Sequence, residues 1–335
     1  MKFEGSGSRV RHRRPAAIEE VPGSIRGVEI EMWQRGCERS EWSVVEAHLD
    51  DTVVLSGRMA APFLALGAAD ETDLSFAIRL AGDRAWTMNG HTMGPRDIAV
   101  LGRRGELTST TAGPVHWLAL QISPERLFRY SESIAGRGVY LKHGETHLLT
   151  PQDWQVGGLL RALSKAAELA ASSPALLSNA ALRHGLEAQL MHALVRCLDI
   201  EPLPLRSHHG RVAQRAVSYL QEHDREVIYV ADLCLATGIS ERWLREALQA
   251  VYGTSPMRLL RLRRLNQVHR DLMAGSAGAS SVTEVAMAYG FFDLGRFAKS
   301  YRQVFGEPPS ATLQKRAMRP ASDPVAPAGE RVGTA

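Results

Sequence analysis

The sequence predicts a multidomain α+β protein, with an antiparallel β-barrel and helices in its N-terminal part and an all-α domain with two helix-turn-helix units in its C-terminal part. Three observations predict this order. Short apolar segments separated by Gly and Pro occupy residues 41–122, helical periodicity follows them, and one helical arrangement occurs twice in the last third of the chain. The 335 residues, 44% of them hydrophobic, are enough for two or three domains with separate cores.

Five segments in the first part have the length and apolar pattern of β-strands. Turn residues separate them, as at Gly57, Gly82 and the pairs Gly94-Pro95 and Gly113-Pro114. Such spacing is typical of a small antiparallel barrel or sandwich. The five segments read WSVVEAHL, DTVVLSG, LSFAIRL, DIAVLG and VHWLALQI.

Two helices are expected between residues 152 and 200, because the apolar residues there recur every three or four positions. The second helix carries a row of leucines in steps of four. That row has two interpretations, since it can pack against the same row of a second chain or cover the barrel of its own chain. One stripe does not distinguish them. The row consists of Leu182, Leu186, Leu190, Leu194 and Leu198.

Composition indicates where the expected parts begin and end. Pro202 and Pro204, with the polar residues that follow them, indicate a linker. The last residues are rich in Pro, Ala and Gly and are expected to be disordered. The expected division is an N-terminal arm over 1–40, the barrel with its helices over 41–200, with the helices at 152–200, the linker over 201–210, the helical domain over 211–317 and a tail over 318–335.

One helical arrangement occurs twice in the C-terminal part of the sequence. In each copy, a two-turn helix ends at a glycine that can adopt the left-handed conformation, Gly238 or Gly290. An apolar residue follows, and then Ser240 or Asp293 can cap the next helix. This order of a short helix, a glycine turn and a capped second helix predicts a helix-turn-helix in each copy.

The basic charge is concentrated in the same part of the chain. Between Arg206 and Arg319 there are 17 Lys and Arg against 10 Asp and Glu, a balance of +7, whereas the whole chain carries +4. Several of these arginines lie on a long helix expected over residues 257–273, between the two copies. The basic end of the molecule is therefore where a polyanion is expected to bind.

Residues 207–316 resemble the DNA-binding domain of the AraC/XylS family of bacterial regulators. The most specific stretch runs from Ala286 to Ser310 and reads AMAYGFFDLGRFAKSYRQVFGEPPS, which is similar to the family's signature for the second unit across nearly its whole length. The chain departs from the family pattern at Thr312 and Leu313, where an aromatic residue and an Arg are usual. This departure affects the last turn of the domain.

The resemblance implies two recognition helices about 34 Å apart that enter successive major grooves of double-stranded DNA. Arg can donate two hydrogen bonds to guanine, and Glu can accept one from cytosine, so these residue types suit base readout. Arg302 is expected at a phosphate instead, and Trp243 in the core or at its rim. The alternative for each cation is a solvated surface position. The expected DNA-contacting residues are Arg242, Arg245, Glu246, Arg296, Lys299 and Arg302.

The same resemblance implies a cupin-like sensor barrel followed by dimerisation helices in the N-terminal part. The turn and strand patterns over residues 94–101 and 113–116 agree with such a barrel. The expected partners are double-stranded DNA, RNA polymerase, a small-molecule effector and a second copy of the chain, and the expected role is activation. The alternative is a dimeric regulator without a ligand, controlled by a protein partner or by its own abundance.

No residue is assigned to the effector site. Four aromatic side chains in the first part can stack on an aromatic ligand, but aromatic residues are more often part of a core. These four are Phe63, Phe76, Trp86 and Trp117.

No motif indicates an enzyme, and we expect no catalytic residue, metal or cofactor. The sequence has no phosphate-binding loop, Ser nucleophile elbow or paired-carboxylate site. His91 and His116 lack the spacing of a metal-binding cupin, and His143 and His147 are expected in a loop after the barrel. DNA alkyl-repair proteins carry a similar DNA-binding domain but need a zinc-bound cysteine cluster, and only Cys37 precedes the barrel. An enzyme with a DNA-binding appendage is therefore the weaker alternative, and it would require a bound metal.

The sequence also favours a cytoplasmic chain. Its three cysteines are far apart and form no CxxC pair, which fits neither a disulfide framework nor a zinc cluster. The basic N-terminal residues are followed by no apolar segment, and no run of 18 apolar residues occurs. Neither secretion nor a membrane span is expected.

Overall fold

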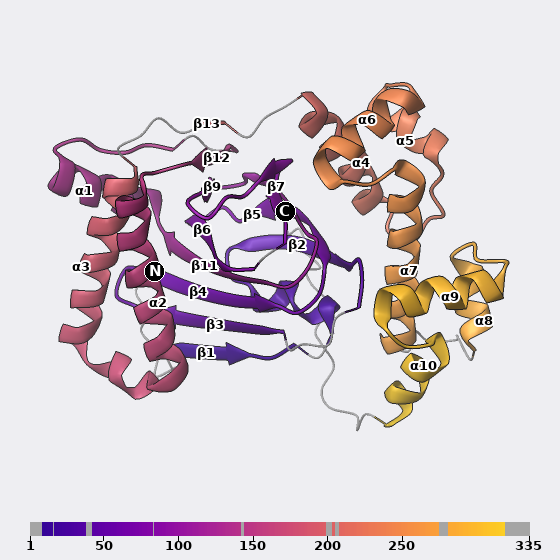
Figure 1. Ribbon diagram of the computed structural model, residues 1–335, viewed down its shortest axis with the longest axis horizontal. Coiled ribbons are helices and arrows are strands. Elements are labelled where there is room, and N and C mark those ends of the chain that lie inside the picture. Colours follow the sequence, from indigo (N-terminus) through magenta and orange to yellow (C-terminus); the bar gives the residue numbers. More distant parts are fainter. Residues whose placement is uncertain are drawn as a thin grey trace, which may run out of the picture. The chain divides into compact units, whose positions relative to one another are not determined.

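The computed structural model describes residues 9–15, 17–37, 42–82, 84–141, 144–198, 203–204, 208–274 and 281–318. The chain divides into two compact units, Met1–Arg264 and Leu265–Ala335. The first unit holds two β-sheets and the helices up to the first half of α7, and the second unit is helical (Figure 1). The expected tail over 318–335 lies almost wholly outside the described residues, as does half of the expected linker over 201–210.

The larger sheet, sheet A, is antiparallel throughout, with the strand order β1-β3-β4-β11-β6-β9-β12-β13. All five segments that the sequence predicts as strands are strands, and all five belong to this sheet, as β3, β4, β6, β9 and β11. Its strands are β1 (Val10–Arg13), β3 (Ser43–His48), β4 (Thr52–Met59), β6 (Leu74–Ala81), β9 (Ile98–Leu101), β11 (Val115–Ile122), β12 (Thr146–Leu149) and β13 (Leu203–Pro204).

The smaller sheet, sheet B, is also antiparallel and has the order β2-β5-β10-β7-β8. None of its strands is predicted from the sequence. The first 40 residues, expected as an arm, contribute β1 to sheet A and β2 to sheet B. The strands of sheet B are β2 (Val28–Gln34), β5 (Phe63–Ala69), β7 (Trp86–Met88), β8 (His91–Thr92) and β10 (Glu106–Thr111).

The two sheets do not close into the cupin-like barrel expected from the sequence, and this expectation is wrong in that respect. Within the described residues, no strand of sheet A pairs with a strand of sheet B, although the Thr146 hydroxyl on β12 donates a hydrogen bond to the Glu106 carbonyl on β10 at 2.8 Å. The sheets instead face each other across an apolar core. Ile18, in a short 3-10 segment (Ile18–Glu20), and Val21, between this segment and a second one (Pro22–Ser24), are packed into that core.

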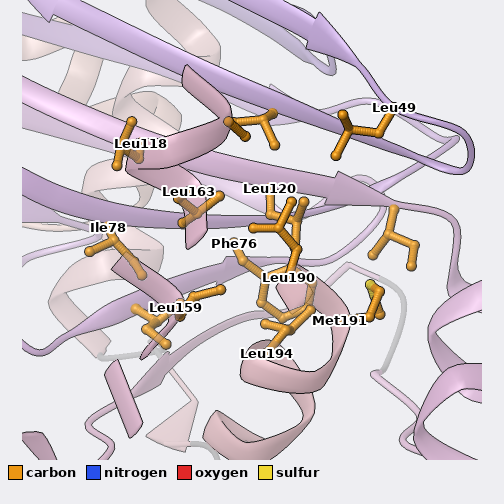
Figure 2. Packing of buried hydrophobic residues seen from close by; sticks show 14 of the residues in the cluster. Leu49, Phe76, Ile78, Leu118, Leu120, Leu159, Leu163, Leu190, Met191 and Leu194 are labelled. Atoms are coloured by element: carbon orange, nitrogen blue, oxygen red, sulfur yellow. The ribbon is translucent and has the colours of Figure 1, made fainter. Parts of the chain in front are cut away.

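Two long helices, α2 (Asp153–Ser172) and α3 (Ala180–Cys197), cover the outer face of sheet A (Figure 1). Leu159 and Leu163 of α2 and Leu190 and Leu194 of α3 meet Phe76 of β6 in one continuous core (Figure 2). A 3-10 segment at Pro174–Ser178 connects the helices. The structure thus confirms two helices in this region.

The leucine row on α3 belongs to this core. Leu190 and Leu194 are fully buried, Leu186 and Leu198 are nearly so, and Leu182 packs at the edge. These leucine side chains are buried against sheet A of the same chain, so they offer no apolar surface to a second chain. Of the two interpretations of the row, the covering helix is therefore the one that the fold adopts.

A further helix, α1 (Pro124–Ala135), was not predicted from the sequence. The hydroxyl of Ser123 accepts a hydrogen bond from the Arg126 amide, and Pro124 occupies the first helical position. Gly136 ends the helix at a φ of 69°. These start and stop signals are present in the sequence, but they lie directly after the long apolar strand β11.

The remaining helices form the C-terminal part. In the first unit these are α4 (His208–Glu222), α5 (Val230–Thr237), α6 (Glu241–Tyr252) and the first half of α7 (Pro256–Ala274). The second unit contains the rest of α7 with α8 (Val282–Ala288), α9 (Leu294–Phe305) and α10 (Pro309–Met318).

Sheet B lies between two apolar cores of the first unit. Along β5, Phe63 and Ala65 face the core between the sheets, whereas Leu64 and Leu66 belong to a core that includes residues of α4, α6 and α7. The Gln221 amide on α4 donates a hydrogen bond of 3.4 Å to the Leu66 carbonyl. Because side chains alternate along a strand, one short strand contacts both layers.

None of the helices in the described residues combines the length and apolar character needed to cross a membrane.

Candidate nucleic-acid interface and interior cavity

The first helix pair, α5 and α6, is joined by the turn that the sequence predicts. Gly238 ends α5 at a φ of 71°, a left-handed conformation that suits glycine. The Ser240 hydroxyl accepts a hydrogen bond from the Trp243 amide and so caps α6. Leu244 and Leu248 of α6 are fully buried against α4 and α5, which fixes the opposite face of α6 toward solvent.

That outward face of α6 carries two ion pairs. The Arg242 side chain, 86% exposed, lies 3.0 Å from the Glu246 carboxylate, and Arg245 lies 2.7 Å from Glu241. Ion pairs at exposed helix positions contribute little stability, because water competes for both groups. The arginines are therefore accessible to another anion. Trp243 lies at the rim of this face, with its ring 5.5 Å from that of His209.

The second helix pair, α8 and α9, repeats these features. Gly290 adopts a φ of 77° in the turn. The Asp293 carboxylate accepts a hydrogen bond of 2.9 Å from the Arg296 amide and caps α9. Phe297 and Tyr301 are buried on the inner face of α9. The same local chemistry thus positions α6 and α9 within their own units.

The outer face of α9 is cationic. Lys299 and Arg302 are exposed, and the Arg296 side chain is 77% exposed, with its Nε 3.8 Å from Asp293 Oδ2. Gly295 stands beside them, and a Cβ at this position would contact only the Asp293 side chain. The open, positively charged surface can admit a phosphate backbone or the edge of a base pair.

Two of the arginines on α7 have structural roles that the sequence analysis did not predict. Arg263 is 1% exposed, and its guanidinium donates hydrogen bonds to the carbonyls of Leu220, His223 and Glu226 at the end of α4. Arg264 donates one to the Ile228 carbonyl. A cation is favourable there, because the last carbonyls of a helix lack partners within the helix. The charge available to a polyanion is accordingly smaller than the residue count indicates.

A separate apolar cavity of about 80 Å³ lies between sheets A and B. Three of the four aromatic residues noted in the sequence, Phe63, Trp86 and Trp117, line it. The fourth, Phe76, lies on the other face of sheet A, in the core under α2 and α3. Alternation along the strands separates them, and the sequence alone does not show which face of a strand points inward.

The described residues contain no group of three or more His, Cys, Asp or Glu arranged to hold a metal ion. His143 lies outside those residues, and the Nε2 atom of His147 lies 3.3 Å from the Glu145 carboxylate. The three cysteines are free thiols. Burial raises the pKa of the Cys197 thiol to about 12, which makes it a poor nucleophile.

Residues 233–315 match a helix-turn-helix domain family. The probable thc operon regulatory protein of Rhodococcus erythropolis is 37% identical over 103 residues, 31% of this chain and 31% of that protein. The XylDLEGF operon transcriptional activator 2 of Pseudomonas putida is 38% identical over 106 residues, 32% of this chain and 68% of that protein. A solved structure of a probable AraC family transcriptional regulator from Rhodopseudomonas palustris is 36% identical and covers 32% of this chain and 97% of that one, with a TM-score of 0.30.

The similarity is concentrated in the C-terminal part, and the matching region spans about a third of the length of the Rhodococcus erythropolis protein. The helix-turn-helix family match begins within α5, includes α6, α8 and α9, and ends within α10. The resemblance expected from the second glycine turn and the sequence around it is thereby confirmed. The chain belongs to the AraC/XylS family of transcriptional regulators.

Proposed function

We propose that this chain activates transcription by binding a specific DNA site through α6 and α9, the second helices of two helix-turn-helix units, in response to a small molecule in its sheet domain. The observation that carries the proposal is an arrangement that occurs twice: a left-handed glycine, a side-chain cap and a second helix whose outer face presents exposed arginines. Family membership and the activator names of the Pseudomonas putida relatives support it.

The proposed roles follow from exposure and hydrogen-bonding capacity. Arg242, Arg245 and Arg296 read guanine, because a guanidinium can donate to both acceptors on its major-groove edge. Glu246 either holds Arg242 in place or accepts from cytosine. The exposed pair between Arg242 and Glu246 costs little to open, so it does not oppose DNA binding. Lys299 and Arg302 contact phosphates or, for Lys299, a base.

The effector part of the proposal is supported by the position of sheet B. One face of this sheet lines the interior cavity, and its other face packs against the core that includes residues of α4, α6 and α7. A ligand that alters the position of β2 or β5 therefore acts on both layers. RNA polymerase and a second copy of this chain are further proposed partners, and a dimer contact would have to use a surface other than the buried leucine row.

The test begins with selection of genomic DNA fragments by the purified chain, followed by footprinting and affinity measurements against competitor DNA. We expect one preferred site with two protected blocks about one helical turn apart. Arg242→Ala and Arg296→Ala should each reduce discrimination at one block by about 1–3 kcal/mol. Arg161→Ala, which removes an exposed cation from α2, is the matched control and should leave discrimination unchanged.

Sequence-independent binding at physiological salt, with and without added small molecules, would contradict the proposal. Equal weakening on all DNA sequences by both alanine variants would contradict the assigned base contacts, because a phosphate contact carries no sequence information. A regulator without a ligand would show full site selectivity that no small molecule changes.

A further inference from the structure

The interior cavity contains a side chain whose orientation is fixed and whose oxygen has no partner. Gln121, on β11, is 2% exposed. Its amide nitrogen donates hydrogen bonds to the Arg26 carbonyl at 2.8 Å and to the Ser75 hydroxyl at 3.1 Å. The reversed amide would place its oxygen against the Arg26 carbonyl, acceptor against acceptor. The nitrogen therefore stays on this side.

Gly27 makes room for this arrangement. A Cβ at residue 27 would lie 2.2 Å from the Gln121 amide nitrogen, and the residue has a φ of 78°. The backbone beside β2 is thus shaped around the Gln121 amide.

The Gln121 oxygen is buried and has no hydrogen-bond partner among the described residues. Gln121 is also one of the residues that line the cavity. A buried acceptor without a partner is unfavourable, and the great majority of such groups in proteins are satisfied. A donor that enters the cavity would satisfy it.

The rest of the wall restricts the chemistry of that donor. Trp86 and Trp117 contribute flat apolar surfaces. The Trp86 nitrogen is already satisfied, because it donates to the Ser109 hydroxyl at 2.7 Å. Arg26 is the one ionisable residue among the described residues of the wall, and its guanidinium is paired with Asp73 at 3.2 Å. A ligand carboxylate would therefore be desolvated without a free cation to balance it.

Size restricts the ligand further. The cavity of about 80 Å³ is smaller than the roughly 150 Å³ apolar cavity that is known to bind benzene. Met32, Met59 and Met88 line it, and methionine side chains change rotamer easily, so the space can adapt by a few atoms. With that adjustment the cavity can hold a molecule no larger than a single ring, whereas a long chain does not fit.

We infer that the cavity binds a neutral, single-ring aromatic molecule whose hydroxyl or N–H group donates a hydrogen bond to the Gln121 oxygen. Its ring lies against Trp86 or Trp117. That this molecule changes DNA binding rests on the proposed function, and the inference adds the chemical class of the effector. Binding itself is measured without DNA.

Three test ligands of similar size separate the contributions. Phenol has the donor, toluene lacks it and benzoate carries a charge. Their affinities for the full chain are measured by calorimetry, with tryptophan fluorescence as a second signal. We expect phenol to bind about tenfold more tightly than toluene, and benzoate to bind most weakly. Equal binding of phenol and toluene, preference for benzoate or no binding at millimolar concentration would overturn the inference.

Two variants locate the site. Gln121→Leu should abolish the preference for phenol over toluene while toluene still binds, and retained toluene binding reports an intact cavity. Ala119→Leu, which fills the cavity from the neighbouring part of β11, should reduce binding of both ligands at least tenfold. If Gln121→Leu abolishes toluene binding as well, Ser75→Ala provides the second test, since it leaves the Gln121 oxygen in place and should retain the preference. Unchanged binding by Ala119→Leu would overturn the assignment.

The outcomes also separate this inference from the proposed function. Absence of a phenol preference in the unaltered chain together with selective DNA binding would overturn the ligand assignment alone. A phenol preference in a chain that binds DNA without selectivity would overturn the proposed function and leave the ligand assignment standing.

Discussion

The Nδ1 atom of His269 on α7 lies 2.6 Å from the hydroxyl oxygen of Tyr301 on α9. The Tyr301 hydroxyl donates to the Thr312 hydroxyl at 2.9 Å, which in turn donates to the Glu307 carboxylate at 2.8 Å. Since the tyrosine proton is used in that direction, Nδ1 of His269 must carry the hydrogen of the first bond. The second unit is therefore held by a directional chain of hydrogen bonds behind its exposed helix.

This arrangement predicts a pH dependence of stability. Burial lowers the pKa of His269 to about 4, despite the Glu307 carboxylate, which acts in the opposite direction. The unfolded residue has a pKa of about 6.5, so the unfolded state binds a proton first as the pH falls. Above pH 6.5 His269 is neutral in both states and the folded state keeps its full stability. As the pH falls toward 4 the unfolded state is protonated first, and we expect the free energy of unfolding to fall by about 3 kcal/mol.

The measurement is urea unfolding of the full chain between pH 7 and pH 4, with His269→Gln as the comparison. The variant should be less stable at pH 7 and should show a shallower loss over this range. An NMR titration that places the imidazole pKa near 6.5 would contradict the prediction.

Arg263 is expected to be essential for stability, although it lies among arginines that suggest a role at DNA. Arg263→Ala removes the side-chain donor of three carbonyls in and just after the last turn of α4, of which the His223 carbonyl keeps the Glu226 amide, and we expect a loss of at least about 2 kcal/mol in the free energy of unfolding. Arg261→Ala, on the exposed face of the same helix, should change it by less than about 0.5 kcal/mol. Similar unfolding midpoints for the two variants would show that the buried guanidinium has no special role.

Five of the eight strands of sheet A were predicted from the sequence, whereas β1, β12, β13 and the strands of sheet B were not. The predicted strands of sheet A include long apolar runs such as β11 and β6, and both faces of this sheet are covered, whereas β1 reads VRHR and β13 has two residues. In sheet B, β10 consists largely of Thr and Ser, and β5 contains Ala and Gly. The Thr and Ser residues of β10 give neither an apolar run nor an alternation, so periodicity does not detect this strand. The apolar run of β5 and the alternation of Val and Ile with Glu in β2 are strand signals that the interpretation of the sequence missed. Closure of the sheets depends on pairing between distant edges, which periodicity does not encode.

The candidate DNA interface was predictable because its signals are local. A glycine turn and a cap, as at Gly238 and Ser240, act within a few residues. The role of Arg263 depends on α4, about 40 residues earlier in the chain, so counting cations cannot reveal it. The same limit applies to Gln121, whose partner Arg26 is 95 residues away.

Leu66 is expected to transmit the effect of a cavity ligand to the first helix pair. It packs against the helical core on the face of β5 opposite Ala65, which lines the cavity. Leu66→Ala should cost about 3 kcal/mol in the free energy of unfolding, leave phenol binding within about twofold and abolish any change that phenol causes in the Kd for DNA. Leu176→Ala, a half-exposed leucine elsewhere, is the control. If phenol changes the Kd for DNA in Leu66→Ala as much as in the unaltered chain, Leu66 does not transmit the effect of the ligand.

Arg302 is expected to contact a phosphate, and this makes a prediction about salt. A phosphate contact releases counterions on binding, so the logarithm of the association constant falls with the logarithm of salt concentration. Arg302→Ala should weaken binding to all DNA sequences by a similar factor and reduce the magnitude of this slope by about 1. Arg296→Ala, on the same exposed face of α9, should instead weaken binding mainly to the preferred site. A sequence-dependent loss in Arg302→Ala would move this residue from the phosphate backbone to a base edge.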